Sequence, residues 1–361
     1  MEHFTVFRDE NYFAAWPFNG GFWQFKDGEL LVGFVRGKVN YSDPGTVGHG
    51  QVDCDRGEHV VLRSTDGGET WPLEEIVTVY TRPAQDEAIK ELKSSVAAES
   101  GFDPKADGFC LIAGYGIPPK DNPNHAFIQV STDRGRTWNP PVRLPNGKLT
   151  SISPRPSYVV REDGMLLLFG HGSRSTERDH SLPQMGVAPL IWASWDGGAS
   201  WGILTEMEVF PRFPGAIMPY PIILDDGQMI AALRRQYDGY SAFTQIYASD
   251  DDGRTWDFLS RVNDWGAPAS LTQLADSRIV CVYGYRQKPW GIRARISEDY
   301  AESWGEEIIL RDDGGSWDLG YPRTQLRDDG SLVTVYYFNS QDDPIQCEGG
   351  VRHIAATLWE I

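Results

Sequence analysis

The sequence contains few cysteines and no long hydrophobic run. Its four cysteines have no metal-ligand spacing, and they are too few to cross-link a chain of 361 residues. No stretch approaches the length of a membrane span, and residues 1–9 carry charges instead of an apolar secretion signal. We therefore expect a cytoplasmic chain with no metal and no cofactor, and with reduced, mostly buried thiols at Cys54, Cys110, Cys281 and Cys347.

Positive charge is also scarce. The chain has 33 lysines and arginines against 51 aspartates and glutamates, which gives a formal net charge of -18. An acidic surface repels the phosphate backbone of DNA and RNA, so we exclude nucleic acid as a partner. An anionic glycan stays compatible, because a few arginines around a cleft can reverse the potential locally.

Aromatic residues, glycine and proline are abundant by contrast. The chain has 13 tryptophans, 38 glycines and 23 prolines. This composition suits many short strands joined by tight turns, and it predicts few helices.

An eight-residue motif, S-x-D-x-G-x-[ST]-W, recurs along the chain. In each copy the aspartate can accept backbone N–H bonds inside a turn, the glycine supplies a positive φ and the tryptophan can bury its ring. The fifth copy has Ala301 in place of glycine, so we expect that turn to be strained or differently shaped. The five copies, called Asp boxes here, occupy 64–71, 131–138, 194–201, 249–256 and 297–304.

A second repeat alternates with the Asp boxes. It consists of an apolar run, an Asp-Gly pair and another apolar run, which is a hairpin signal. Clear copies lie at 22–31, 157–167, 221–230 and 324–333; a copy at 270–280 has Asp-Ser, and a weaker copy begins at Asp107-Gly108. The two repeats together predict six blades in one domain over residues 1–361.

The predicted fold is all-β, a six-bladed β-propeller with four-stranded antiparallel blades. The last blade lacks an Asp box, so we expect its third strand at 351–360 and its outer strand from the N-terminus, at 4–7, which would close the ring. Only 85–100 has helical spacing of its apolar residues, and we interpret it as a helical insertion in a loop.

With these Asp boxes the chain resembles the sialidase (neuraminidase) superfamily, whose members are six-bladed propellers. The resemblance extends over the whole chain at the level of blade repeats. It implies that the mouth of the propeller binds a carbohydrate. It also implies a tyrosine nucleophile, an acid/base aspartate and a triad of arginines that bind a sugar carboxylate.

The resemblance assigns these roles to particular residues. Tyr321, in the segment 318–323, stands where the family has its nucleophile. Asp53 stands near the place of the acid/base, with His49 beside it. The triad arginines would be Arg234 in a middle blade and Arg286 or Arg293 in the blade after it.

The chain departs from the family at two places. Met218 occupies the position of the glutamate that activates the tyrosine, and a thioether accepts no proton. Residues 16–21 lack the first arginine of the triad. The resemblance therefore implies a divergent member acting on another sugar, with Asp318 as the candidate replacement for the glutamate.

Starts of inner strands and top loops would converge at the mouth of such a propeller. Arginines there can bind a carboxylate in bidentate fashion, a tryptophan can stack on a sugar and a histidine can act as a base. The further substrate-binding candidates are Arg36, Arg155, His171, Arg235, Trp290 and Arg323.

These residues favour an exo-acting glycoside hydrolase that removes a terminal, possibly acidic sugar. Asp53 and Tyr321 facing each other would give retention, whereas Asp53 and Asp318 could invert through water. A polysaccharide lyase acting on a uronate, with His49, His171 or Tyr321 as base or acid, is an alternative. A glycan-binding propeller without catalysis would need only the aromatic residues and the arginines.

Overall fold

The computed structural model describes residues 1–48, 52, 57–81, 101–115, 126–174, 187–209, 214–237 and 241–361. The chain divides into two compact units, residues 1–84 with 265–361 and residues 85–264. The first is called unit 1 and the second unit 2. Each unit contains three antiparallel sheets, which confirms the predicted all-β, six-bladed propeller. The expected helix at 85–100 and Cys54 lie outside the described residues.

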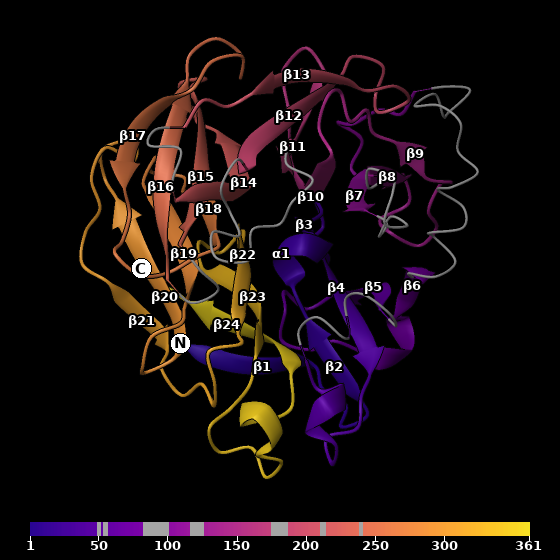
Figure 1. Ribbon diagram of the computed structural model, residues 1–361, viewed down its shortest axis with the longest axis vertical. Coiled ribbons are helices and arrows are strands. Elements are labelled where there is room, and N and C mark those ends of the chain that lie inside the picture. Colours follow the sequence, from indigo (N-terminus) through magenta and orange to yellow (C-terminus); the bar gives the residue numbers. More distant parts are fainter. Residues whose placement is uncertain are drawn as a thin grey trace. The chain divides into compact units, whose positions relative to one another are not determined.

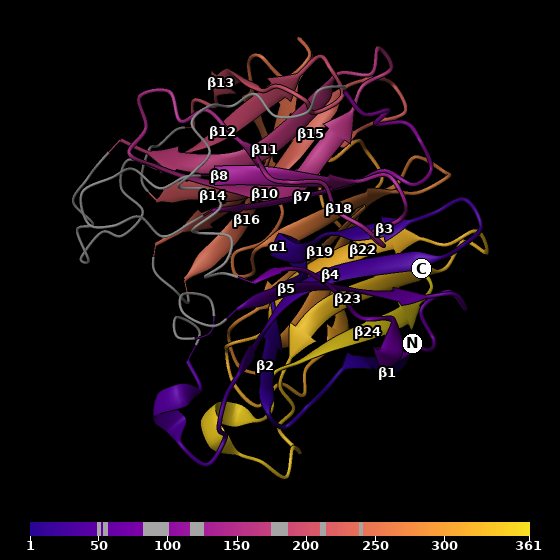
Figure 2. The same ribbon diagram turned by 90° about the vertical axis from the view of Figure 1, so that its right-hand side faces the viewer.

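Unit 1 begins and ends in the same blade. In the last blade, β1 pairs antiparallel with β24, as expected for an outer strand supplied by the N-terminus. Figures 1 and 2 show the indigo β1 beside the yellow β24. The strands of this blade are β22 (Gly320–Leu326), β23 (Leu332–Phe338), β24 (His353–Trp359) and β1 (Glu2–Phe7).

The first blade has an interrupted inner strand. Both β2 and β3 pair with β4, and the four-residue helix α1 (Pro17–Gly20) lies between them. Trp16 has a left-handed φ of 63° and Pro17 has no N–H, so the strand cannot continue through this point. The strands are β2 (Tyr12–Ala15), β3 (Phe22–Gln24), β4 (Leu30–Lys38), β5 (Glu58–Ser64) and β6 (Val77–Thr81).

The fifth blade completes unit 1. Its strands are β18 (Ala269–Gln273), β19 (Ile279–Tyr285), β20 (Gly291–Ser297) and β21 (Ile308–Arg311). Strand β22 of the last blade packs against β18 and β19. Unit 1 also has short 3-10 turns at Pro44–Thr46, Leu73–Glu75 and Cys347–Gly349.

Unit 2 contains the second, third and fourth blades. The second shows three strands among its described residues, β7 (Cys110–Tyr115), β8 (Ala126–Ser131) and β9 (Val142–Arg143). The third has β10 (Ser151–Val160), β11 (Leu166–Ser173), β12 (Val187–Ser194) and β13 (Gly202–Glu206). The fourth has β14 (Gly215–Ile223), β15 (Met229–Gln236), β16 (Ala242–Ser249) and β17 (Asp257–Arg261). Strand β10 packs against β7, next to it in Figure 2.

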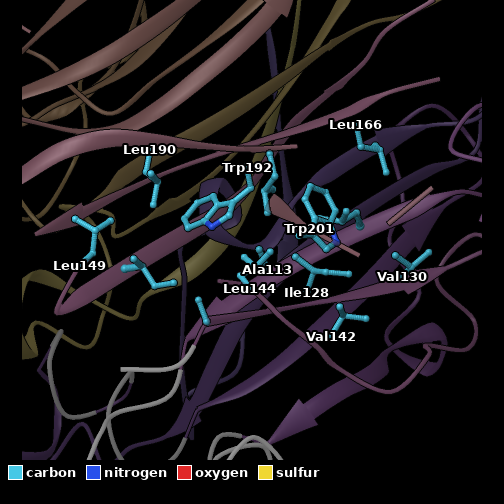
Figure 3. Close-up of a cluster of buried hydrophobic side chains, with 14 of the residues drawn as sticks. Ala113, Ile128, Val130, Val142, Leu144, Leu149, Leu166, Leu190, Trp192 and Trp201 are labelled. Carbon is cyan, nitrogen blue, oxygen red and sulfur yellow. The ribbon is translucent and has the colours of Figure 1, made fainter. Parts of the chain in front are cut away.

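Apolar side chains from neighbouring blades form the cores. Figure 3 shows one such cluster in unit 2, in which Trp192 and Trp201 of the third blade lie among aliphatic side chains of the second. A second cluster joins the third and fourth blades, and a third joins the fifth and last blades in unit 1. Both faces of a blade are covered, which explains the nearly continuous apolar runs in strands such as Leu166–Ser173.

The Asp boxes fasten the hairpins that follow the third strands. In the first box, Asp66 Oδ1 accepts the Thr70 N–H over 2.9 Å, and Ser64 Oγ accepts the Gly68 N–H over 2.9 Å. The Trp71 indole N–H donates to the Gly68 carbonyl over 3.0 Å. These bonds all join residues within one octapeptide, so the turn is specified locally.

The fifth box has the same turn with alanine in it. The Ala301 N–H donates to Ser297 Oγ over 2.8 Å, and the Ser303 N–H donates to Asp299 Oδ1 over 2.8 Å. Ala301 adopts a φ of 71°, in the left-handed region that favours glycine. The predicted strain is present, and the turn keeps the shape of the other boxes.

Among the described residues no helix has the length and apolar character needed to cross a membrane.

Candidate active site

Three blades share an irregularity in their first strands. In β10, β14 and β22 the register shifts at an X-Pro pair, and the residues X are Arg155, Met218 and Tyr321. Proline has no N–H for the ladder, so these residues leave regular pairing. Met218 and Tyr321 adopt φ values of 52° and 54°, a strained conformation that is concentrated at functional sites.

In unit 1, Asp318 is the centre of a buried polar network. The Tyr337 hydroxyl donates to Asp318 Oδ1 over 2.6 Å, and Arg352 Nε lies 3.5 Å from Asp318 Oδ2. All three side chains are buried. Burial and the negative charge of Asp318 hold the pKa of Tyr337 well above its ordinary value, so Tyr337 stays a neutral donor and Asp318 accepts from it.

Arg286 joins this network to Tyr321. Its Nη2 donates to the Tyr337 hydroxyl over 3.2 Å and to the Leu319 carbonyl over 3.2 Å. Its guanidinium carbon lies 5.4 Å from the ring centroid of Tyr321 and 5.3 Å from that of Trp317. Arg286 therefore forms one cluster with Asp318 and Tyr321, which were predicted from a different segment of the chain.

Tyr321 is held by aromatic rings as well. Its ring meets Phe18 edge-on, with centroids 6.3 Å apart, and meets Tyr337 at 5.7 Å. Arg323 donates from Nη2 to the Phe18 carbonyl over 2.7 Å and stacks over the Phe18 ring. Arg323 thus fixes α1 beside β22, and α1 in turn supports Tyr321.

The other candidates of unit 1 have protein partners of their own. Arg293 Nη2 donates to the Pro289 carbonyl over 3.1 Å, and its Nε lies 3.4 Å from a Glu307 oxygen. Arg36 pairs with Glu58 over 3.0 Å. The half-buried Trp290 ring is covered by Lys288, whose Nζ lies 4.8 Å from the ring centroid.

In unit 2, Arg155 is buried with part of its hydrogen-bonding capacity unused. Its Nη1 donates to Ser153 Oγ over 2.6 Å and to the Pro154 carbonyl over 2.9 Å, and its guanidinium lies over the Tyr115 ring. The Nε atom is buried and has no acceptor among the described residues. A buried guanidinium with a spare donor suits an anionic or strongly accepting ligand.

The charges of two of the predicted arginines, Arg155 and Arg234, act on His171. The Met218 N–H donates to its Nδ1 over 3.5 Å, which places the proton of the neutral ring on Nε2. Burial, together with the charges of Arg155 and Arg234, holds the pKa of His171 well below its ordinary value. The ring is therefore neutral at neutral pH.

Arg234 and Arg235 leave β15 on opposite faces of the strand. Arg234 Nη1 lies 3.8 Å from the Met218 sulfur, so the thioether contacts the arginine at the position where the family has a carboxylate. Arg235 donates from Nη2 to the Pro214 carbonyl over 2.8 Å and from Nη1 to Gln245 Oε1 over 2.5 Å. Arg235 thus joins three segments of the fourth blade.

Two catalytic candidates, His49 and Asp53, lie outside the described residues. Six of the others form two clusters, Asp318–Tyr321–Arg286 in unit 1 and Arg155–His171–Arg234 in unit 2, while Arg36, Arg235, Trp290, Arg293 and Arg323 contact other residues. The described residues hold no group of three or more His, Cys, Asp or Glu side chains that could bind a metal ion.

Sequence reasoning missed Tyr337 and Trp317. Tyr337 lies in an apolar run of β23 and was indistinguishable from a core residue there. Trp317 directly precedes Asp318 and belongs to no Asp box, which is the one signal that could have singled it out.

The fold and these clusters define the class of protein as a six-bladed Asp-box propeller with arginine, tyrosine and carboxylate groups buried at its strand starts. Residues 55–334 match the BNR repeat-like domain, and the chain belongs to this family. The predicted resemblance to the sialidase superfamily is confirmed at this level.

Two curated relatives and one solved structure illustrate the similarity. Xyloglucanase Xgh74A of Acetivibrio thermocellus is 24% identical over 283 residues, which are 74% of this chain and 30% of that protein. The sialidase of Micromonospora viridifaciens is 27% identical over 226 residues, 56% of this chain and 35% of that protein. The chain thus spans about a third of these relatives' length. A Dyadobacter fermentans protein of unknown function has a TM-score of 0.77 at 24% identity, covering 100% of this chain and 98% of that one.

Proposed function

We propose that this protein is a glycoside hydrolase that removes a terminal sugar from a glycan, with Tyr321 as the reacting group. The observation that carries the proposal is the cluster in which a buried arginine, Arg286, lies against the ring of the strained Tyr321 beside the carboxylate of Asp318. The named activities of the curated relatives, a xyloglucanase and a sialidase, support a glycan as substrate.

The sequence is compatible with retention through Tyr321 and with inversion through Asp318, and the contacts of Asp318 favour the first. Its Oδ1 accepts from Tyr337 and its Oδ2 faces Arg352, an arrangement that stabilises the ionised carboxylate. As the base of an inverting reaction Asp318 would have to hold the attacking water, and its 4% exposure leaves little room for one. A retaining reaction through Tyr321 fits better than inversion through Asp318.

In the proposed reaction the Tyr321 oxygen bonds to the anomeric carbon as the glycosidic C–O bond breaks. Asp53 would protonate the leaving oxygen and then take a proton from the water that releases the sugar. The phenolic proton of Tyr321 passes to solvent or to a substrate group, because Met218 cannot accept it, and the phenolate takes up a proton again when water releases the sugar. A neutral phenol is a suitable nucleophile where a carboxylate on the sugar repels an anion.

The cluster of unit 2 supports an acidic substrate. Arg155 and Arg234 are both buried, and Arg155 Nε has no acceptor among the residues that the structure describes. A sugar carboxylate would satisfy such a group. Arg155→Met should therefore weaken the binding of sialyl and uronyl oligosaccharides more than that of neutral ones.

The test is hydrolysis of a panel of sialylated, uronate-containing and xyloglucan oligosaccharides, with the anomeric configuration of the first product followed by NMR. We expect retention, and a loss of about a thousandfold or more in kcat for Tyr321→Phe. The exposed Tyr300 supplies a matched control, since Tyr300→Phe should leave the rate unchanged.

Three results would replace the proposal. Inversion of the anomeric configuration would show that carboxylates, and not Tyr321, carry out the reaction. A product with an unsaturated uronate would identify a lyase. Binding of the glycans without turnover would identify a glycan-binding propeller.

A further inference from the structure

Trp317 is a partly exposed residue on a segment that is fastened on both sides by one buried side chain. Asn339 Oδ1 accepts the Ser316 N–H over 2.6 Å, and Asn339 Nδ2 donates to the Asp318 carbonyl over 2.7 Å. Asn339 is completely buried. Its amide therefore bridges the peptide groups before and after Trp317 and fixes where this side chain leaves the backbone.

Further contacts prevent the segment from shifting. The Gly315 N–H donates to the Asn339 carbonyl over 3.0 Å, and Arg352 Nη2 donates to Ser316 Oγ over 3.2 Å. A Cβ atom on Gly315 would lie 2.0 Å from the Gly349 carbonyl oxygen, so the backbone at Gly315 is in close contact with the backbone at Gly349. The segment has the fixed geometry of a binding element and not that of an ordinary surface loop.

The ring of Trp317 is held as firmly as its backbone. The Arg286 guanidinium carbon lies 5.3 Å from the centroid of the Trp317 ring and 5.4 Å from that of the Tyr321 ring. Arg286 is itself tied to the Leu319 carbonyl, one residue past Asp318. The indole is thus part of the Tyr321 cluster, while part of its apolar surface remains in water.

A rigid aromatic surface in water has no favourable role in folding, because the hydrophobic effect favours its burial. It does have one in binding, since its position costs no ordering when a ligand covers it. The face of a pyranose that carries its axial C–H groups is the kind of apolar surface that fits a flat indole.

We propose that Trp317 is the stacking residue of this site, whose exposed surface receives the apolar face of a sugar ring, with Asn339 and Arg352 as the residues that position it. The inference rests on the proposed function for its ligand class. It adds that recognition at Trp317 depends on ring shape, so neutral and acidic pyranoses are bound alike there, in contrast to the charge recognition proposed for Arg155.

The test observes the indole N–H signals of 15N-labelled protein during titration with a xyloglucan oligosaccharide and, separately, with sialyllactose. The Trp317 signal is assigned by its loss in Trp317→Phe. We expect it to shift with a ligand of either charge class. Trp317→Ala should weaken binding about tenfold, and Trp317→Phe, which keeps a ring, by only two- to threefold, about a third of that effect in free energy.

Trp195 is the matched control, because it is 67% exposed and lies in the Asp box at 194–201. Trp195→Ala should leave binding unchanged. Circular dichroism of each variant reports its fold, and the titration of the unaltered protein uses Trp317→Phe only to assign the signal.

The outcomes separate this inference from the proposed function. Hydrolysis by the unaltered protein with an unmoved Trp317 signal, or with full affinity in Trp317→Ala, overturns the stacking role and leaves the hydrolase. A shifted Trp317 signal without turnover supports stacking and removes the hydrolase. Absence of both turnover and any glycan-induced shift overturns both.

Discussion

The Tyr337 hydroxyl donates a hydrogen bond of 2.6 Å to Asp318 Oδ1, with both side chains buried in unit 1. The same phenolic oxygen accepts from Arg286 Nη2. The Tyr337 hydroxyl therefore joins the Asp318 carboxylate to the Arg286 guanidinium and satisfies one hydrogen-bonding position on each of them. Removing its hydroxyl affects both charges at once.

Tyr337→Phe should lower the free energy of unfolding by about 1–3 kcal/mol, because a buried carboxylate loses a donor and a buried guanidinium loses an acceptor. Urea denaturation measures the change. Tyr300→Phe, on an exposed ring, should stay within about 0.5 kcal/mol of the unaltered protein. A Tyr337→Phe variant as stable as its parent would show that water replaces the hydroxyl.

A second prediction concerns the pKa of His171. Burial, then Arg155 and Arg234, hold its pKa below the ordinary value of 6.5. Arg155→Met removes one positive charge, so the pKa of His171 should rise while burial still keeps it below 6.5. NMR titration of the imidazole signals measures it. Arg174→Met is the control, since the exposed Arg174 pairs with Glu206 and does not act on His171.

The direction of the linked stability change follows from that pKa. The unfolded chain takes up a proton at its histidine below pH 6.5, whereas folded His171 stays neutral. His171 therefore reduces the free energy of unfolding as the pH falls below this value. The reduction should be smaller in Arg155→Met, and an unchanged pH dependence would count against the proximity of the two groups.

A third prediction concerns the pH dependence of stability that Asp251 gives to an Asp box. The Thr255 backbone N–H and hydroxyl donate to its carboxylate and lower its pKa from the ordinary 3.8. Its ionised form therefore adds stability above pH 3.8 that is lost as the pH falls through the folded pKa. Asp251→Asn should be less stable than its parent at pH 7, with the difference shrinking in acid. Urea midpoints at several pH values test this.

The number of blades could be predicted because the Asp box is a local structure. The hydrogen bonds that shape its turn join residues within eight positions, as in Ser64 to Trp71, so its sequence specifies the turn. Closure of the last blade by β1 followed from counting strands, and the pairing of Glu2–Phe7 with β24 confirms it.

The candidate site was predictable only in part. Tyr321 was predicted from the resemblance, because it stands where the family has its nucleophile, and Asp318 was predicted as the replacement for the missing glutamate. The partner of Asp318 is Tyr337, on the next strand, and strand register decides which side chains meet. The role of Asn339 in fixing Trp317 depends on a loop conformation that no periodicity encodes.

The fifth Asp box has alanine where the other boxes have glycine. Exchanging the two residue types between boxes therefore measures the strain of a left-handed alanine. Gly253 has a φ of 81°, and a Cβ there would lie 3.3 Å from Leu167 Cδ1. Gly253→Ala should therefore destabilise the protein by about 1–2 kcal/mol, the usual penalty of an L side chain in this region. Thermal or urea unfolding measures the loss.

Ala301→Gly is the matched exchange in the opposite direction. Relief of the strain at φ 71° is partly offset by the greater freedom of glycine in the unfolded chain and by the loss of a buried methyl group. The change should therefore be small, within about 1 kcal/mol, and less than the loss in Gly253→Ala. Equal and opposite changes would show that strain alone decides, whereas a large loss in Ala301→Gly would show that the methyl group fills a space that glycine leaves empty.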